Sequence, residues 1–301
     1  MKIALISHSR IGKTAEPGEK YSEVWAAICK GAERKVRRAG LSGVKNLKIF
    51  SPVSYHDHKE FLTLVDAAVG ENPDALILPF MPTEDDLVKE MTEILSDYQG
   101  KIIAVNVPPT PEIEKRLKNI VGYVGMNEFE AGRMAVRRLF MENETIERII
   151  VVEHEKGHYG HRLRTEGARK ESYDSGIQKV VEIYVGAEEY ETENLKNTLE
   201  GSGLSTDSIT GIITLGVRGT EAALKAIDEA GIVVPIVGMD LNEAVREAIE
   251  SGRVLATLIQ HPEDEGRLAV KMAIGAVNSK LERRVVYCGP TLVDKNNIAV
   301  F

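Results

Sequence analysis

The sequence predicts an α/β protein built from doubly wound parallel sheets. Short runs rich in β-branched residues alternate about ten times with longer amphipathic segments, an order typical of strand–helix–strand units. Most of the short runs are continuously apolar, as in residues 75–80, instead of alternating between polar and apolar side chains. Strands that are covered by helices on both faces have this pattern.

The expected strands are the apolar runs at residues 2–7, 47–51, 75–80, 101–106, 122–124, 148–153, 180–185, 211–215, 235–239 and 254–260. The expected helices are the amphipathic segments at residues 22–39, 58–69, 83–98, 111–119, 128–141, 163–175, 191–200, 218–230, 242–251 and 263–280. These strands are many for one sheet, and they divide naturally into two groups. No linker rich in Pro, Gly or Ser marks a boundary, so we expect two lobes joined by short crossovers.

Several of the expected helices begin at residues that suit a helix N-terminus. Asn127 is a good N-cap for the helix that follows it, and acidic residues occupy its first turn. Thr83 and Asp86 have the spacing of a capping box, and Pro262 stands where a first helical residue tolerates proline.

The ends of three helices are marked by glycine. Gly40, Gly231 and Gly252 each follow a helical run, at the position where a left-handed backbone conformation often ends a helix. We therefore expect helix termini at these residues.

Composition excludes several classes of protein. Lys and Arg total 38 against 46 Asp and Glu, which gives a net charge of −8 and no basic field for nucleic acid or an anionic membrane. No apolar stretch approaches the roughly 18 residues that a membrane span needs. Two cysteines cannot form a disulfide scaffold or a four-cysteine zinc site.

Common catalytic and nucleotide-binding motifs are absent from the sequence. There is no G-x-x-x-x-G-K-[ST] loop and no G-x-S-x-G elbow. The first strand is followed by residues 7–12, Ser-His-Ser-Arg-Ile-Gly, and not by the G-x-G-x-x-G turn of dinucleotide sites. We expect neither an enzyme nor a bound cofactor.

The histidines are the most suggestive residues. All seven lie just beyond expected strands and none in the middle of an expected helix: His8, His56, His58, His154, His158, His161 and His261. Ligands of open α/β sheets bind at the carboxyl ends of the strands, so we expect one or two of the histidines to line a cleft. A metal site at His154, His158 and His161 stays an alternative, although an expected loop lacks the helix that aims two imidazoles at one ion. Our prediction is that no metal is bound.

Five segments, read in order, resemble the type I periplasmic binding proteins, and among them the sugar receptors related to ribose-binding protein. They are Tyr123–Arg133 (YVGMNEFEAGR), Arg164–Gly167 (RTEG), Gly219–Ile227 (GTEAALKAI), Ile236–Asp240 (IVGMD) and Ala256–Pro262 (ATLIQHP). Each motif is weak alone, but their order and spacing together are specific. The resemblance covers essentially the whole chain.

The resemblance implies two Rossmann-like lobes, each a parallel sheet flanked by helices, joined by three hinge crossovers. It places lobe one at residues 1–125 plus 262–287 and lobe two at residues 126–261 plus 288–301. The lobes of these proteins close around a small solute, and lac-repressor-like regulators share the same core.

The resemblance also implies ligand-binding residues. Trp25 stands where the family has an aromatic ring that stacks on a sugar, which suits the apolar C–H face of a pyranose. Arg164, Asp240 and Gln260 stand at positions that hydrogen-bond sugar hydroxyls, and charged groups of fixed geometry suit vicinal hydroxyls.

Other positions depart from the family. Asn106 replaces the usual aspartate at one strand end, and Gly216 replaces an asparagine or aspartate. The first loop is longer than usual and includes Arg10 and Lys13. With Arg218 and cleft histidines such as His8, these cations favour an anionic or oxidised ligand and argue against ribose itself.

The leading hypothesis is a receptor that closes its lobes on a sugar, polyol or sugar acid and delivers it to an ABC importer. The alternative is the effector-sensing core of a lac-repressor-like regulator, which would carry a DNA-binding segment ahead of residue 2; the chain alone is not expected to bind nucleic acid or to insert into a membrane. Location follows the same division: periplasmic or extracytoplasmic if an export signal was removed, and cytoplasmic if Met1 is the native start.

Overall fold

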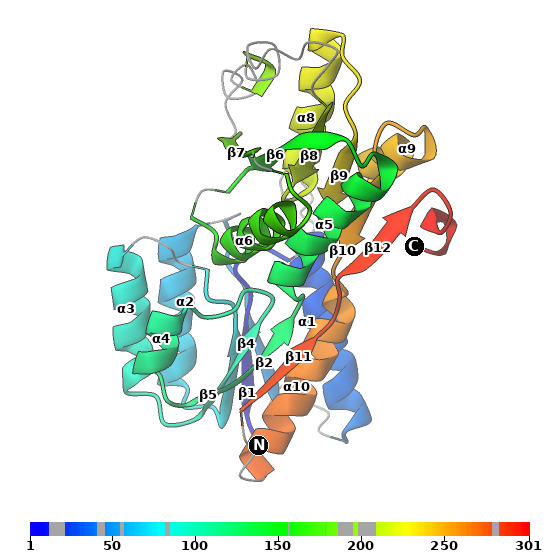
Figure 1. Ribbon diagram of the computed structural model, residues 1–301. Helices are drawn as coiled ribbons and strands as arrows, with labels where there is room; N and C mark the ends of the chain where they lie inside the picture. Colours follow the sequence, from blue (N-terminus) through cyan, green and yellow to red (C-terminus); the bar gives the residue numbers. More distant parts are fainter. Residues whose placement is uncertain are drawn as a thin grey trace. The chain divides into compact units, whose positions relative to one another are not determined.

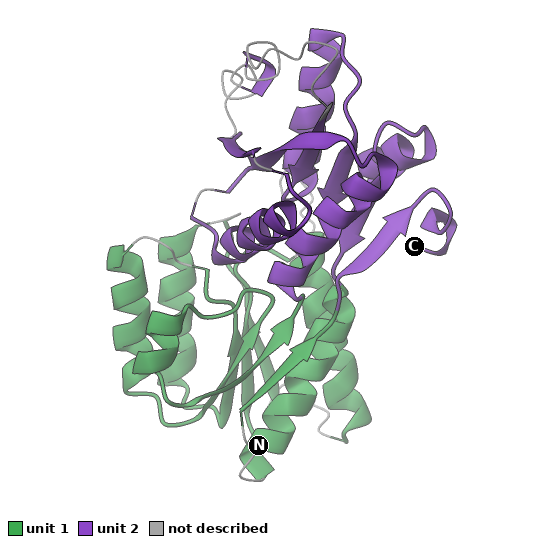
Figure 2. Ribbon diagram, viewed as in Figure 1, with its two compact units in different colours: residues 1–126, 261–288 green, residues 127–260, 289–301 purple. Residues whose placement is uncertain are grey.

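The computed structural model describes residues 1–11, 22–40, 46–54, 57–81, 85–155, 157–177, 179–185, 195–197, 209–278 and 283–301. The chain forms two compact units (Figure 2). Unit 1 comprises Met1–Met126 and His261–Cys288, and unit 2 comprises Asn127–Gln260 and Gly289–Phe301. The chain therefore passes between the units after residues 126, 260 and 288.

Unit 1 contains a parallel sheet whose strands follow the order β11-β5-β4-β3-β1-β2. Its strands are β1 (Ile3–Ile6), β2 (Leu47–Phe50), β3 (Ala75–Leu78), β4 (Lys101–Val105), β5 (Ile120–Gly125) and β11 (Arg284–Tyr287). Its helices are α1 (Glu23–Arg38) and α10 (Pro262–Asn278) on one face of the sheet, and α2 (His58–Gly70), α3 (Asp85–Ser96) and α4 (Pro111–Arg116) on the other (Figure 1).

The central strands of unit 1, β1, β3, β4 and β5, are buried on both faces of the sheet, as the sequence predicts. In β1, Ile3 and Leu5 belong to the hydrophobic cluster under α1 and α10, whereas Ala4 and Ile6 belong to the cluster under α2 and α3. Successive side chains of a strand point to opposite faces, so a strand between two helix layers needs apolar residues at every position.

Unit 2 repeats this arrangement with the strand order β12-β10-β9-β8-β6-β7. Its strands are β6 (Ile146–Glu153), β7 (Lys179–Tyr184), β8 (Ile209–Thr214), β9 (Ile236–Met239), β10 (Ala256–Ile259) and β12 (Thr291–Asp294). Its helices are α5 (Glu128–Glu142) and α6 (Tyr159–Asp174) on one face, and α8 (Val217–Ala230) and α9 (Glu243–Glu250) on the other. A short 3-10 helix, Ile298–Val300, follows β12, and β12 alone among the paired strands runs antiparallel to its neighbour, β10.

One pair of helices in each unit crosses at glycines. In unit 1, a Cβ atom on Gly266 of α10 would lie 1.8 Å from the carbonyl oxygen of Ile28 in α1. In unit 2, a Cβ atom on Gly132 of α5 would lie 1.8 Å from the carbonyl oxygen of Arg164 in α6. Because no side chain fits at these distances, only glycine allows the helix backbones to approach so closely.

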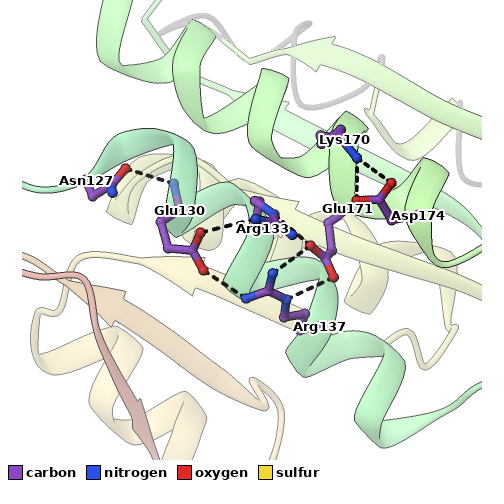
Figure 3. A network of polar contacts seen from close by, with 7 residues as sticks. All are labelled: Asn127, Glu130, Arg133, Arg137, Lys170, Glu171 and Asp174. Carbon is purple, nitrogen blue, oxygen red and sulfur yellow. Dashed lines mark hydrogen bonds and ion pairs between the residues drawn. The ribbon is translucent and has the colours of Figure 1, made fainter.

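Ion pairs extend the contact between α5 and α6 beyond the glycines (Figure 3). The Glu171 carboxylate of α6 accepts hydrogen bonds from the Nε atoms of Arg133 (2.8 Å) and Arg137 (2.9 Å) of α5. Arg137 also donates to Glu130 at 2.8 Å. The two arginines hold the pKa of Glu171 below its usual range although partial burial opposes them, so the ionised network fastens the two helices together.

The predicted fold class is confirmed, and the ten expected strands all form. Strands β11 and β12 were not predicted, because these short edge strands are largely exposed or half-buried and lack a continuous apolar run. The N-cap at Asn127, the first helical residue at Pro262 and the left-handed glycines at 40, 231 and 252 are also confirmed. The expected capping residue Thr83 and most of the expected helix at residues 191–200 lie outside the described residues.

Candidate functional site

Polar residues gather at the carboxyl edge of the unit 2 sheet. His154 follows β6, Asp240 follows β9 and Gln260 follows β10. Helix α6 begins just beyond β6 and supplies Arg164. The carboxyl ends of neighbouring parallel strands meet at one edge of a sheet, which is where α/β proteins bind small molecules.

A buried ion pair joins α5 to α6 at this edge. The Arg164 Nε atom donates to the Glu128 carboxylate at 2.5 Å, and Arg164 Nη1 donates to the carbonyl oxygen of Leu215 at 2.7 Å. Both charged side chains are at most 5% exposed. Burial raises the pKa of Glu128, and the adjacent guanidinium opposes that rise. The arginine therefore has a fixed position at the ends of β6 and β8.

The glycine crossing explains why this pair forms. Glu128 is the first residue of α5, directly after the N-cap Asn127, whose side chain accepts a hydrogen bond from the Glu130 N–H. Gly132 lies one turn further and touches the backbone of Arg164. The close approach at Gly132 thus brings the side chains of Glu128 and Arg164 together.

Asp240 has an unusual backbone conformation, with φ of 66°. Its carbonyl oxygen accepts a hydrogen bond from Thr257 Oγ1 at 2.7 Å, and its Oδ1 accepts one from Gln260 Nε2 at 2.9 Å. Aspartate and asparagine tolerate this left-handed region better than most residues. Two of the predicted ligand residues, Asp240 and Gln260, are therefore in direct contact.

Three imidazoles lie beside Arg164. The ring centroids of His158 and His161 are 4.3 Å apart, and those of His154 and His161 are 5.0 Å apart. The expected position of His161 in a loop is wrong, because α6 begins at Tyr159, four residues before its predicted start. The cause is the N-cap: His158 Nδ1 accepts a hydrogen bond from the His161 N–H at 3.2 Å, a role the sequence analysis did not assign to histidine.

The imidazoles do not converge on a common point. Among the described residues, no group of three or more His, Cys, Asp or Glu side chains is arranged to hold a metal ion. The rings are tilted against one another in ring contacts.

Two titratable groups at this edge have shifted pKa values. Burial raises the pKa of Glu153, the last residue of β6, to about 7, and the nearby Glu182 and Glu155 add to that effect. Burial, followed by the neighbouring His158, Arg164 and His154, lowers the pKa of His161 well below its usual value. His161 is therefore a neutral imidazole at neutral pH.

Two of the predicted ligand residues, His8 and Asn106, lie at the carboxyl edge of unit 1. His8 is fully buried after β1, 3.4 Å from Ser9 Oγ, and its ring contacts His58 and Phe61. Asn106, after β4, donates from Nδ2 to Glu265 of α10 at 3.2 Å. Its backbone φ is 65°.

The remaining predicted ligand residues of unit 1 have different surroundings. Trp25 is 4% exposed and belongs to the hydrophobic cluster under α1 and α10. Arg10 is half-buried, and its carbonyl oxygen accepts a hydrogen bond from the Ser22 N–H at 2.8 Å. Lys13 and His56 lie outside the described residues. The ligand roles of His8, Arg10, Trp25 and Asn106 stay predictions.

Three acidic residues of the two edges were not among the predicted site residues: Glu128, Glu153 and Glu265. Each stands in a segment of predicted strand or helix. The separation of 36 residues between Glu128 and Arg164 hides their pairing. A usable signal was present in the glycines at 132 and 167, which mark a close helix crossing.

The sequence of residues 17–281 matches the family model described as periplasmic binding protein domain. The chain belongs to the periplasmic binding protein family. The resemblance to its type I, ribose-binding-like members is confirmed, and the family is one of binding proteins. No curated protein shows significant sequence similarity to the chain.

Solved structures share the fold of this periplasmic binding protein over its whole length. A glucose-galactose binding protein, GanP from Geobacillus stearothermophilus, is 17% identical, with a TM-score of 0.79 and 98% of each chain covered. A solute binding protein from Actinobacillus succinogenes with bound D-allose is 20% identical, with a TM-score of 0.75 over 100% of this chain and 99% of the other. A carbohydrate transporter protein from Acidothermus cellulolyticus in complex with myo-inositol is 22% identical, with a TM-score of 0.74 over 99% and 96%.

None of the described helices of this periplasmic binding protein combines the length and the apolar composition that crossing a membrane requires.

Proposed function

We propose that the protein is a receptor for a monosaccharide or a related polyol. The observation that supports this most strongly is the group of fixed polar side chains at the carboxyl edge of unit 2. Arg164 is oriented by Glu128, and Asp240 by Gln260. Pre-oriented charged donors and acceptors bind the hydroxyls of a sugar strongly, since each hydroxyl can both donate and accept.

The family and its solved members favour the same ligand class. The structures with bound D-allose and myo-inositol hold a neutral, polyhydroxylated molecule on this fold. At the edge of unit 2, the three acidic residues Glu128, Glu153 and Asp240 outnumber the two guanidinium groups, of Arg164 and of Arg218 after β8. This balance favours neutral hydroxyls over the sugar acid that the cations of the first loop suggested, because an added carboxylate would meet like charges.

The mechanism we propose is closure of the two units around the ligand. The chain passes between them at three places, and hinges of this kind absorb the backbone change in a few residues. Closure follows from ligand contacts that both carboxyl edges make only in the closed state. Release to an ABC importer outside the cytoplasm is the last part of the proposal.

A thermal-shift screen of the refolded protein tests the ligand class. The panel contains pentoses, hexoses, polyols and sugar acids. A ligand at 100 times its dissociation constant adds about 2.7 kcal/mol to the stability of a one-site receptor, which raises the Tm by roughly 2–4 °C per kcal/mol at this chain length. We expect a clear shift with a neutral member of the panel.

Two matched variants connect a hit to the proposed site. Asp240→Asn removes one charge but keeps a residue that tolerates the left-handed backbone, and we expect it to abolish the shift. Asp228→Asn makes the same change on the exposed face of α8, where the carboxylate contacts only Arg253 among the ion pairs of the described residues, and should leave the shift intact. A screen without any shift, or a shift that Asp240→Asn preserves, contradicts the proposal.

A further inference from the structure

Glu153 and His161 lie close together at the edge of unit 2 without forming a hydrogen bond to each other. Glu153 ends β6, and His161 lies in the first turn of α6. The distance from His161 Nδ1 to Glu153 Oε1 is 3.7 Å, which is too long for a hydrogen bond. His161 Nδ1 is buried and has no hydrogen-bond partner among the described residues. A buried polar atom without a hydrogen bond destabilises the folded state.

Neighbouring groups hold the ring of His161 in place. Its backbone N–H is bonded to His158 Nδ1, and its ring contacts the rings of His158 and His154. The His154 ring in turn fills the space above Gly216, since a Cβ atom at Gly216 would lie 2.4 Å from His154 Cε1. These contacts fix the ring of His161, so a direct hydrogen bond within the pair requires the half-buried Glu153 side chain to move toward Nδ1.

This pair belongs to the same edge as the predicted ligand residues. Arg164 is one turn along α6 from His161 and bonds the carbonyl oxygen of Leu215, the residue before Gly216. The charged and titratable groups around the pair, element by element, are Glu128 from α5, Glu155 after β6, Glu182 from β7, His158 and Arg164 from α6, His154 after β6 and Asp240 after β9.

We propose that Glu153 and His161 form a proton-gated binding position for one ligand hydroxyl. With Glu153 ionised, a hydroxyl placed between the two groups donates to the carboxylate and bonds His161 Nδ1, as acceptor or donor according to the imidazole tautomer. With Glu153 protonated, its own O–H donates to the neutral Nδ1 and the pair satisfies itself. The ligand then loses one hydrogen-bonding position. This inference rests on the proposed function and adds its regulation by pH.

The direction and the range of the pH effect follow from the raised pKa of Glu153, about 7. Between pH 8 and pH 6, the ionised fraction of a group with this pKa falls about tenfold. If only the ionised pair binds the ligand well, the dissociation constant rises by the same factor. A sugar acid would show the opposite trend, since protonation removes a repelling charge.

Calorimetric titration between pH 8 and pH 6 tests the inference with the neutral sugar or polyol that the thermal-shift screen identifies. For the wild type we expect the dissociation constant to rise about tenfold on acidification. Glu153→Gln mimics the protonated pair, because its amide can donate to His161 at every pH, so its affinity should be about tenfold weaker at pH 8 and independent of pH. Glu147→Gln, at an exposed position of the same strand, is the matched control and should behave as the wild type.

His161→Gln provides a second test that removes the imidazole and keeps a polar side chain, and circular dichroism of each variant verifies the fold. We expect the dissociation constant of His161→Gln to depend less on pH, because the protonated carboxyl group of Glu153 no longer has an imidazole nitrogen to donate to. A wild-type affinity that is constant from pH 8 to pH 6, or a tenfold change that persists in Glu153→Gln, overturns the inference and leaves the receptor function standing. Loss of all binding in Asp240→Asn, with binding retained in Glu153→Gln, confirms that the two proposals were tested separately.

Discussion

The two units have the same scaffold and different carboxyl edges. Both sheets have the same strand order, and both units cross one helix pair at glycines. After the fourth strand of each unit, Asn106 and Asp240 have φ of 65° and 66°, and a hydroxyl of the next strand, from Tyr123 or Thr257, donates to the carbonyl oxygen of each. The backbone of the edge is thus duplicated along with the fold.

The side chains at these equivalent positions have diverged. The helix that follows the first strand is α1 in unit 1 and α6 in unit 2, and the N-cap side chain of each accepts a hydrogen bond from the N–H of the third helical residue, which is Trp25 in unit 1 and His161 in unit 2. The residue whose carbonyl oxygen meets the glycine of the partner helix is Ile28 in unit 1 and Arg164 in unit 2. Glycines and apolar runs therefore determine the common fold of the two units, whereas the side chains at the carboxyl edges differ in polarity and charge.

The largest expected effect concerns the buried ion pair between Glu128 and Arg164 in unit 2. Arg164→Met leaves Glu128 buried without its partner, which destabilises a protein by about 3–5 kcal/mol. Without the guanidinium the folded pKa of Glu128 rises further above its unfolded value, so the loss grows as the pH rises and is smallest near pH 5. Urea unfolding at pH 5 and pH 8 measures this difference.

The double variant Glu128→Gln with Arg164→Met is the control, and it should recover much of the lost stability because no buried charge remains. If Arg164→Met has the same unfolding free energy at pH 8 as the wild type, the ion pair does not contribute to the stability of unit 2, which would contradict the prediction.

Substitution of alanine for glycine at the helix crossings should destabilise the two units equally. Gly132→Ala and Gly266→Ala each place a Cβ atom 1.8 Å from a backbone oxygen, and overpacking of this kind costs about 1–3 kcal/mol or more. Gly70→Ala, where a Cβ atom meets nothing within 4 Å, should be neutral or slightly stabilising. Thermal unfolding of the three variants compares them, and tolerance of alanine in only one unit would refute the equivalence of the two crossings.

Two glutamates of unit 2 should respond to pH in opposite directions. The folded pKa of Glu171 is lowered, so its stabilising effect is present above its unfolded pKa and disappears as the pH falls through the folded value. Glu171→Gln should therefore lower stability by about 1.5–3 kcal/mol at pH 7, a typical loss for a hydrogen bond to a charged group, and by little near pH 3.

The folded pKa of Glu153 is raised, so the stability it contributes is present below its unfolded pKa and is lost as the pH rises through about 7. Glu153→Gln should raise the unfolding free energy at pH 8 and have little effect at pH 4. Denaturant titrations across pH 3–8 distinguish the two glutamates, and the same pH trend in both variants would contradict the assigned environments.

The smallest effects are expected at the equivalent helix caps. Ser22→Ala and His158→Ala each remove one N-cap acceptor, a loss of about 1 kcal/mol. His158→Ser should restore the cap without the ring. If His158→Ser is as unstable as His158→Ala in thermal unfolding, the ring contact with His161 contributes more than the cap.

The sequence predicted the scaffold because repeated local signals determine it. Runs rich in apolar and β-branched residues predicted ten of the strands, and Asn127, Pro262 and Gly231 marked helix ends correctly. The edge strands β11 and β12 lack that signal, since most of their residues are not buried.

The candidate site was predictable only in part. Motifs pointed to Arg164, Asp240 and Gln260, and the structure places all three at the carboxyl edge of unit 2. The partners Glu128 and Glu153 were missed, because pairing across 36 residues and burial of a carboxyl group depend on the helix crossing and not on local pattern. The start of α6 was missed for a related reason: histidine is an uncommon N-cap.

Hydrogen exchange with and without the bound sugar tests the central claim most directly. The claim is that one ligand contacts the carboxyl edges of both units. We predict that the ligand slows amide exchange in unit 1 near His8 and Asn106 and in unit 2 near His161 and Asp240, with little change in helix α3. Protection confined to one unit, or located away from both edges, would contradict it.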